Sequence, residues 1–272
     1  MGAGVVSLTN DDRKFIAKTI EEAGKILAGY FCTTLERNVK GIAADYNTKA
    51  DRESEAYIFG KLKKRFPNFS FLGEETGKQQ SESEYEFILD PLDGTHTFGI
   101  GFPIFAISLA LMKKNEVVFG IVHEPIPRMT YIATKGEGAT RNGKRIHVNT
   151  TADLPHAVIS YTQGWKVRER RAEALLHALQ KALDPYERFI EMWSPSSELA
   201  HIASGHITAS INYKNEVYDF AAGKLLIREA GGRITNLDGT IQKNDRDAIF
   251  VASNGTVLHD EILKRIRGII PA

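Results

Sequence analysis

Residues 87–95 carry the sequence FILDPLDGT, in which a short apolar segment runs directly into two aspartates, a proline and a glycine. The apolar segment is typical of a buried β-strand. Pro91 has no amide hydrogen to donate to a neighbouring strand, and Gly94 can adopt the backbone angles of a tight turn. We therefore expect the strand to end at Leu89 and a turn to follow it.

The two carboxylates of this segment, Asp90 and Asp93, favour a cation site. Three residues apart on a turn they can face a common point, where like charges repel strongly unless a cation lies between them. Oxygen ligands without a cysteine or histidine ligand pattern favour magnesium over zinc. The free amides of Gly94 and Thr95 and the threonine hydroxyl suit a phosphate. Taken alone, an ordinary turn with a capping threonine explains the segment equally well.

Two further acidic segments belong with this one. Glu74 and Glu75 follow an apolar strand expected at residues 69–72 and so repeat the order of strand, acid and turn. Asp219 precedes a helix expected from Ala221, where exposed amides and the helix dipole favour a carboxylate. Individually, a solvated glutamate pair and an ordinary helix cap are simpler interpretations. Together with residues 90–95, however, these acids indicate one shared site.

The surrounding pattern predicts an α+β half over residues 1–150 and an α/β half over residues 151–272. In the first half, a hairpin is expected to join two antiparallel strands, 105–112 and 117–122. The second half alternates between the two kinds of element. We expect helices at 9–35, 52–65, 167–183, 197–203, 221–229 and from 258, and strands at 69–72, 87–89, 105–112, 117–122, 130–133, 146–148, 158–161, 189–192, 208–212 and 249–252.

The composition is that of an ordinary globular protein. Of 272 residues, 42% are hydrophobic and 25% are charged, and the net charge is +1. Because positive and negative charges nearly balance, the protein as a whole has no electrostatic field that would attract nucleic acid or an anionic membrane. No signal pattern and no apolar run of bilayer length is present in the sequence, so we expect a cytoplasmic protein without nucleic-acid or membrane partners. The single cysteine, Cys32, excludes an internal disulfide, and we expect it to be a buried thiol of the first helix.

The acidic segments, in their order along the chain, resemble the motifs of the inositol monophosphatase family. These segments are residues 73–76 (GEET), 90–98 (DPLDGTHTF), 219–223 (DFAAG) and 229–232 (EAGG). This magnesium-dependent, lithium-sensitive superfamily includes the fructose-1,6-bisphosphatases. Residues 120–125 and 136–143 are similar to further family segments, so the resemblance covers about residues 48–232. It implies a layered αβαβα sandwich, hydrolysis of a small phosphate monoester by metal-activated water, and a homodimer.

The resemblance also implies ligands for two to three Mg²⁺ ions. Glu74, Asp90 and the backbone carbonyl of Leu92 would hold the first ion. Asp90, Asp93 and Asp219 would hold the second, and Glu74 would reach a third through water.

Catalytic roles follow from the same resemblance. Residues 48–51 (TKAD) resemble the family's Thr-x-x-Asp element, so Asp51 would pair with Thr95 to orient and deprotonate the attacking water. Glu74 is the third catalytic candidate that the resemblance implies. The amides of Gly94 and Thr95 would hold the transferred phosphoryl group. Arg37 and Lys40 lie where the family has a loop over the metals, although a solvated loop is the simpler interpretation.

The part of the chain that would face the substrate departs from the family pattern. Residues 191–197 (EMWSPSS), here called the substrate wall, replace the usual Arg-Ser-x-Gly-Ser/Thr-Ala-Ala. Trp193 and Pro195 must reshape this wall. Asn212 stands seven residues before Asp219, where members acting on inositol have an acid. The residues that the resemblance makes candidate contacts to substrate or phosphate are Asp93, Gly94, Thr95, Asn212 and Asp219.

These departures leave the substrate open. myo-Inositol monophosphate is the default, and fructose-1,6-bisphosphate, histidinol phosphate and 3′-phosphoadenosine nucleotides are alternatives. A catalytically silent protein that binds metal and phosphate for regulation is the alternative of another class.

Overall fold

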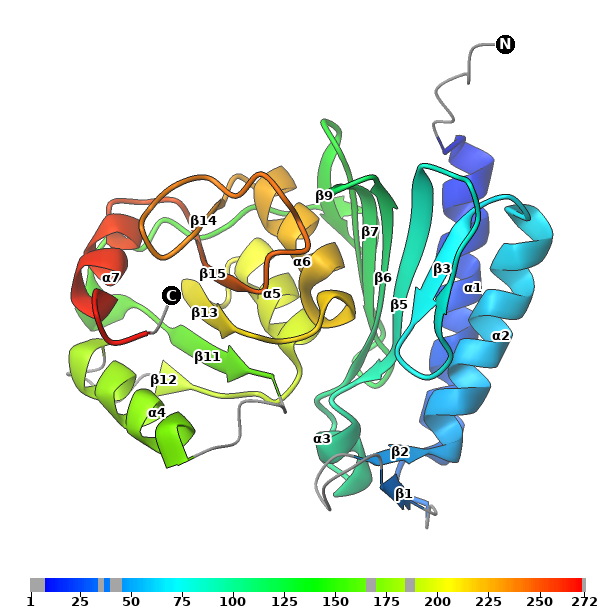
Figure 1. The fold of residues 1–272 in the computed structure, drawn as a ribbon, viewed down its shortest axis with the longest axis horizontal. Coiled ribbons are helices and arrows are strands. Elements are labelled where there is room, and N and C mark those ends of the chain that lie inside the picture. The colour runs from blue at the N-terminus through cyan, green and yellow to red at the C-terminus, as the bar shows by residue number, and fades with distance from the viewer. Residues whose placement is uncertain (1–7, 34–36, 40–45, 165–169, 184–188, 271–272) are drawn as a thin grey trace.

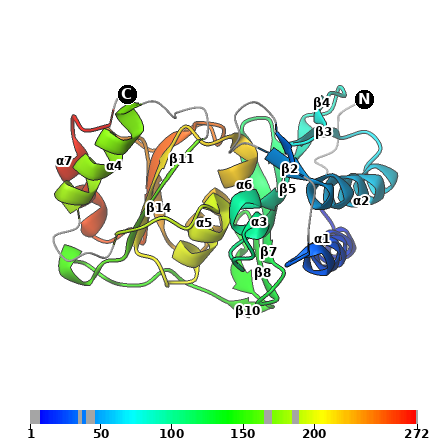
Figure 2. The ribbon, with the colours of Figure 1, turned by 90° about the horizontal axis from the view of Figure 1, so that it is seen from below.

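The structure, a computed structural model, describes residues 8–33, 37–39, 46–164, 170–183 and 189–270. Helices and two sheets alternate in layers (Figure 1). Seen from below, α5 and α6 lie between the sheets, with α1 and α2 at one side of the molecule and α4 and α7 at the other (Figure 2). The predicted αβαβα sandwich is therefore confirmed.

Helices α1 (Asn10–Tyr30) and α2 (Lys49–Arg65) form the first layer. Thr9 caps α1, and its hydroxyl accepts the amide of Asp12 at 3.1 Å, as in a capping box. The expected end of this helix at residue 35 is wrong. The backbone of Phe31 is extended, and its ring packs 5.1 Å from that of Phe105. Cys32 therefore follows the helix in a left-handed conformation and is exposed, which contradicts the expected buried thiol.

The larger sheet has eight strands in the order β10-β9-β8-β7-β6-β5-β3-β4. The hairpin between β6 and β7 is confirmed, because these neighbours pair in antiparallel fashion. A strand at residues 146–148 is wrong: the Val148 amide bonds to Ala230 at 3.1 Å as the chain leaves this sheet for the other half. The strands are β3 (Ser70–Gly73), β4 (Gly77–Gln79), β5 (Tyr85–Asp93), β6 (Ala106–Lys113), β7 (Glu116–Glu124), β8 (Met129–Thr134), β9 (Gly138–Arg141) and β10 (Lys144–Arg145). Two short strands, β1 (Arg37–Val39) and β2 (Tyr46–Thr48), pair separately.

Strand β5 does not stop before Pro91 but continues to Asp93. Its pairing with β6 shifts at this point, because Asp90 lies opposite Ser108 while Asp93 lies opposite Ala106. Three steps on β5 thus correspond to two on β6, which is a β-bulge. The bulge places Pro91 where its missing amide is not required by the ladder.

The smaller sheet has five strands in the order β12-β11-β13-β15-β14. β11 pairs with β12 and β13 in parallel, and the other pairs are antiparallel. The predicted alternation of strand and helix is confirmed for the described residues, although the start of the helix expected at 167 lies outside them. The strands are β11 (Ile159–Gln163), β12 (Phe189–Ile190), β13 (Ala209–Tyr213), β14 (Arg233–Thr235) and β15 (Ile249–Ser253), and the helices are η1 (Leu154–His156), α4 (Arg170–Leu183), α5 (Pro195–Ala203), α6 (Val217–Glu229) and α7 (Leu258–Ile266).

Helix α6 packs very closely against the larger sheet. A Cβ added to Gly120 on β7 would lie 2.9 Å from the carbonyl oxygen of Ala222, and one added to Gly223 would lie 2.5 Å from the Cβ of Leu199 on α5. Small residues on both sides therefore allow the second half to share a core with the first half. The division of the chain near residue 150 stays a prediction. Among the described residues, no helix combines the length and apolarity that crossing a membrane requires.

Candidate metal centre and active site

Asp90, Asp93 and Asp219 converge in the structure, as the sequence predicts. One carboxylate oxygen of each lies within 4.8 Å of those of the other two. Burial raises the pKa of Asp90 and Asp219 well above the usual range, and the charges of neighbouring acids add to this effect. Ionising all three groups in so small a buried volume requires a compensating cation. The donor set consists of hard oxygen atoms, which fits Mg²⁺.

The β5 bulge and the start of α5 fix the first two carboxylates. The amide of Leu92 donates to Asp90 Oδ1 at 2.9 Å. Asp93 Oδ2 accepts the Ser194 hydroxyl at 2.8 Å, the Ser196 amide at 2.7 Å and the Ser196 hydroxyl. Burial raises the pKa of Asp93 to about 6, against the opposing effect of these donors. Asp93 from the first half is therefore oriented by residues of the second half.

Asp219 lies within the first turn of α6 rather than in front of the helix. The expected helix start at Ala221 is wrong, because α6 begins at Val217. The amide of Glu216 donates to Asp219 Oδ2 at 2.8 Å. A carboxylate in this position stabilises the first turn of the helix.

Glu74 follows β3 at the turn into β4, and its amide bonds to the carbonyl of Leu89 on β5 at 3.2 Å. Its negative charge contributes to the raised pKa values of both Asp90 and Asp219, so the structure places it within electrostatic reach of the cluster. The structure thus brings the predicted acids together. Their assignment to particular cations stays a proposal.

Glu55 on α2 is a residue that the sequence analysis missed. It is 1% exposed, and its carboxylate accepts the amides of Glu75 at 3.0 Å and Thr76 at 2.9 Å. A Cβ on Gly73 would lie only 2.4 Å from Glu55 Oε2, so this glycine makes the contact possible. Glu55 therefore fixes the turn that carries Glu74. The available signal is that Asp51 and Glu55 occur four residues apart on one face of a helix, next to apolar residues.

Asp51 and Thr95 meet as predicted. The Thr95 hydroxyl lies 3.2 Å from Asp51 Oδ1 and 3.0 Å from the carbonyl oxygen of Leu92. Asp51 is in the first turn of α2, which starts three residues earlier than expected, and its Oδ2 accepts both the amide (2.7 Å) and the hydroxyl (2.6 Å) of Thr48. Burial raises the pKa of Asp51 to about 7. A carboxyl group that titrates near neutrality suits proton transfer.

Gly94 makes the tight turn between β5 and the short helix α3 (Thr95–Gly99), which lies at the lower end of the larger sheet in Figure 1. Its φ angle is +89°, and a Cβ would lie 2.9 Å from the carbonyl oxygen of Ile104. Both the conformation and the lack of space require glycine here. The turn places Thr95 directly after the β5 bulge.

Asn212 on β13 is fully buried, and its hydrogen bonds stay within its own half. Its Nδ2 donates to the carbonyl of Ala248 at 2.8 Å, and its Oδ1 accepts from Asn215 at 2.8 Å. These contacts hold β13 against neighbouring loops. A contact between Asn212 and substrate therefore stays a prediction.

The substrate wall places Trp193 next to the site. Its backbone has a left-handed φ of +60°, and its ring centroid lies 4.5 Å from that of His96 on α3. His96 thus contacts the opposite half of the molecule. The side chain of Arg37 and all of Lys40 lie outside the described residues.

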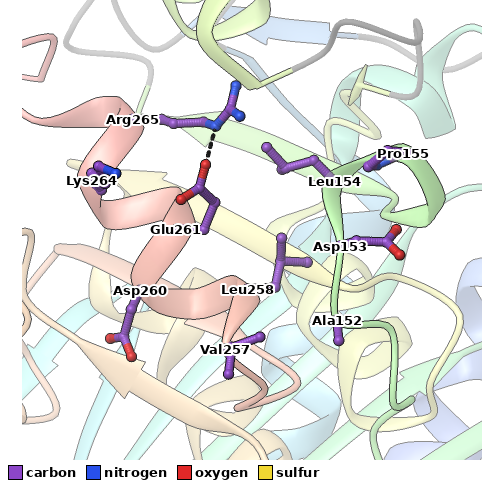
Figure 3. Close-up of a pocket in the computed structure, with 10 residues that line it drawn as sticks. All are labelled: Ala152, Asp153, Leu154, Pro155, Val257, Leu258, Asp260, Glu261, Lys264 and Arg265. Carbon is purple, nitrogen blue, oxygen red and sulfur yellow. Dashed lines mark hydrogen bonds and ion pairs between the residues drawn. The ribbon is translucent and has the colours of Figure 1, made fainter.

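A pocket of about 550 Å³ lies elsewhere, between residues 152–155 and helix α7 (Figure 3). Its lining alternates apolar side chains with charged ones such as Lys264, Glu261 and Asp153. No member of the acidic cluster lines it. The candidate site is therefore identified by the convergence of the carboxylates and not by the volume of this pocket.

Comparison with known proteins gives a consistent result. The sequence profile of the inositol monophosphatase family matches residues 10–270. The inositol-1-monophosphatase of Mesorhizobium japonicum is 33% identical over 249 residues, covering 90% of this chain and 92% of that protein. The Nus factor SuhB of Haemophilus influenzae is 30% identical over 254 residues, covering 92% of this chain and 93% of that protein.

A solved structure shares the fold. The crystal structure of the extragenic suppressor protein suhB from Bartonella henselae matches with a TM-score of 0.87 at 28% identity, covering 96% of this chain and 100% of that one. The motifs, the layers and the profile agree over nearly the whole sequence. The chain belongs to the inositol monophosphatase family.

Proposed function

We propose that this protein is a magnesium-dependent phosphatase that hydrolyses a small phosphate monoester. The observation that carries the proposal is the convergence of Asp90, Asp93 and Asp219 within 4.8 Å, together with the hydrogen-bonded pair of Asp51 and Thr95. Carboxylates that hold cations beside a group able to take a proton are the parts that ester hydrolysis by water requires. Members of this family generally depend on magnesium, which supports the choice of cation.

The residues proposed to hold two to three Mg²⁺ ions are Glu74, Asp90, Asp93, Asp219 and the carbonyl oxygen of Leu92. All five offer oxygen atoms, and the raised pKa values of Asp90 and Asp219 fit a site that is completed by positive charge. Bound Mg²⁺ would neutralise phosphate oxygens and lower the pKa of water.

Side chains of the protein are proposed to take up the proton that the attacking water releases. Thr95 Oγ1 has a single hydrogen and lies between two acceptors, Asp51 Oδ1 and the carbonyl of Leu92. As Thr95 accepts a proton from the attacking water, it can pass its own to Asp51 Oδ1. The raised pKa of Asp51, about 7, allows it to hold that proton near neutral pH. The amides of Gly94 and Thr95 are proposed to hold the phosphoryl group.

myo-Inositol monophosphate is the first substrate to test. The relative from Mesorhizobium japonicum, which is named an inositol-1-monophosphatase, supports this choice. The unusual substrate wall and the neutral Asn212 keep fructose-1,6-bisphosphate, histidinol phosphate and 3′-phosphoadenosine nucleotides as alternatives. The cytoplasmic location and the homodimer remain part of the proposal.

A regulatory role is the second candidate function. The relative from Haemophilus influenzae is named a Nus factor, so a member of this family at 30% identity carries a name that is not that of an enzyme. The presence of the acids, together with Asp51 and Thr95, favours catalysis here. The prediction that nucleic acid is not a partner stays open to a direct binding assay.

A phosphate-release assay over the four ester classes, with and without Mg²⁺, tests the proposal. We expect Mg²⁺-dependent release from at least one ester and loss of activity in Asp93→Asn. Asp153→Asn is the matched control, because Asp153 is exposed and pairs only with nearby His156 in the described structure. No release from any ester, or full activity in Asp93→Asn, would refute the proposed site.

A further inference from the structure

Glu198 is a fully buried acid that the proposed reaction does not use. It lies in the first turn of α5, and its Oε1 accepts the amide of Met192 at 3.0 Å. Burial raises its pKa to about 8, against the opposing effect of the Met192 amide, so it is largely uncharged at pH 7. Acids are rarely buried completely without a specific partner. Here the partner is the backbone of the substrate wall.

The residue after Met192 is conformationally strained. Trp193 has a left-handed backbone, which is uncommon for a large side chain. Such a conformation persists only where the surrounding structure fixes it. Glu198 binds the amide on one side of Trp193, and Asp93 accepts the hydroxyl of Ser194 on the other side at 2.8 Å. Both ends of the strained turn are therefore held.

The ring that this turn presents lies at the candidate site. Trp193 is 44% exposed, and its ring centroid is 4.5 Å from that of His96, which directly follows Thr95 on α3. The two rings come from opposite halves of the molecule and meet next to the residue that pairs with Asp51. A half-exposed tryptophan in this position is available to the organic part of a bound ester.

We infer that Glu198 is a positioning residue, which holds Trp193 against His96 so that the two rings contact the organic part of the substrate. The inference rests on the proposed function for the identity of the ligand. Asp93 also accepts the amide and hydroxyl of Ser196, and these contacts do not involve Met192. Loss of the Glu198 contact should therefore release Trp193 while leaving the carboxylate cluster in place.

Two variants distinguish the effect of the hydrogen-bond acceptor of Glu198 from the effect of filling its buried volume. Glu198→Gln keeps an oxygen acceptor for the Met192 amide and matches the uncharged acid in shape, whereas Glu198→Leu keeps the volume but removes the acceptor. The chain has two tryptophans, so in a Trp165→Phe background selective excitation of tryptophan reports on Trp193 alone. Because Trp193 is already 44% exposed, we expect acrylamide quenching to rise up to about twofold in Glu198→Leu, where the turn opens locally, and to stay unchanged in Glu198→Gln.

Kinetics with myo-inositol monophosphate, or with the preferred ester of the panel, provide the second measurement. We expect Glu198→Leu to raise KM about five- to tenfold while kcat changes less than about twofold, as for a residue that acts on binding alone. The Mg²⁺ concentration at half-maximal activity should not change. If the wild-type protein releases no phosphate, the proposed function fails, while the quenching experiment still tests Glu198.

Hydrogen exchange of the wild-type protein tests the central contact without any variant, in case Glu198→Leu does not fold. The Met192 amide should exchange at least about 100-fold more slowly than in an unstructured peptide. An unprotected Met192 amide would overturn the inference. So would a folded Glu198→Leu variant with unchanged quenching and KM, or a Glu198→Gln variant as defective as Glu198→Leu.

Discussion

The contact between Glu55 and the turn after β3 leads to a specific prediction about stability and Mg²⁺ binding. In Glu55→Gln the side chain keeps its shape but replaces one of its two acceptor oxygens by an NH₂ group, which would face a backbone amide donor. The carboxylate now accepts two amides at 3.0 and 2.9 Å while 1% exposed, so no water can replace the lost acceptor. A charged hydrogen bond contributes about 1.5–3 kcal/mol, and leaving a buried donor unmet costs about 1–3 kcal/mol.

We therefore expect the free energy of unfolding to fall by about 2–3 kcal/mol in Glu55→Gln, measured by urea unfolding without Mg²⁺. Because the same turn carries Glu74, the variant should also bind Mg²⁺ more weakly. Weakening of a supporting contact typically costs about 10-fold or more in metal affinity, which titration calorimetry can detect.

Glu53→Gln is the control on the same helix. Its side chain is 43% exposed, pairs with Lys49 and accepts the Tyr30 hydroxyl at 2.8 Å. Glutamine keeps an acceptor for that hydroxyl, and a surface ion pair contributes about 0–1 kcal/mol. Equal losses in the two variants would show that the effect is not specific to the turn. Wild-type Mg²⁺ affinity in Glu55→Gln would refute the conclusion that Glu55 positions Glu74.

Three further predictions concern proton transfer, packing and pH. Asp51→Asn should lower kcat about 100-fold or more with unchanged Mg²⁺ affinity by calorimetry, and a kcat above one-tenth of wild type would contradict its role. Gly120→Ala should lower the free energy of unfolding by about 1–3 kcal/mol, because its Cβ would meet the backbone of α6, whereas Gly60→Ala, with no atom within 4 Å, should not destabilise. Burial lowers the pKa of His259 from 6.5 to about 4, so the unfolded chain binds more protons between these values and stability falls as pH drops through this window. In urea unfolding at pH 7.5, 6 and 5, His259→Gln should weaken this pH dependence, and an unchanged slope would contradict it.

The elements of the site could be predicted because each has a local signature. Residues 73–76 and 90–95 place acids directly after apolar strands, and Asp219 opens a helix of small residues. These patterns require only short-range information, namely the end of a strand or the start of a helix. The convergence of the acids then follows from the fold that the family resemblance implies.

The features that could not be predicted depend on contacts across the molecule. The expectation that β5 ends before Pro91 is wrong, because a bulge in the pairing with β6 accommodates the proline. The shared helix face of Glu55 and Asp51 is only a weak signal, because a glutamate in the middle of a helix is ordinarily solvated and only the packing of α2 on the β3–β4 turn buries Glu55. Cys32 was placed in a helix that ends earlier, where Phe31 turns to pack against Phe105.

The hydrogen bonds of Asp93 have a mechanical consequence. Asp93 lies on a strand of one half, and its three donors belong to Ser194 and Ser196 of the other half. The halves cannot move apart at this point without breaking these hydrogen bonds and withdrawing Asp219 from Asp90 and Asp93. Binding of the proposed cations and cohesion between the halves would thus be thermodynamically linked, and each would strengthen the other by the same free energy. Removal of the cations by a chelator would then weaken the whole interface between the two halves, far beyond the few atoms that contact the ion.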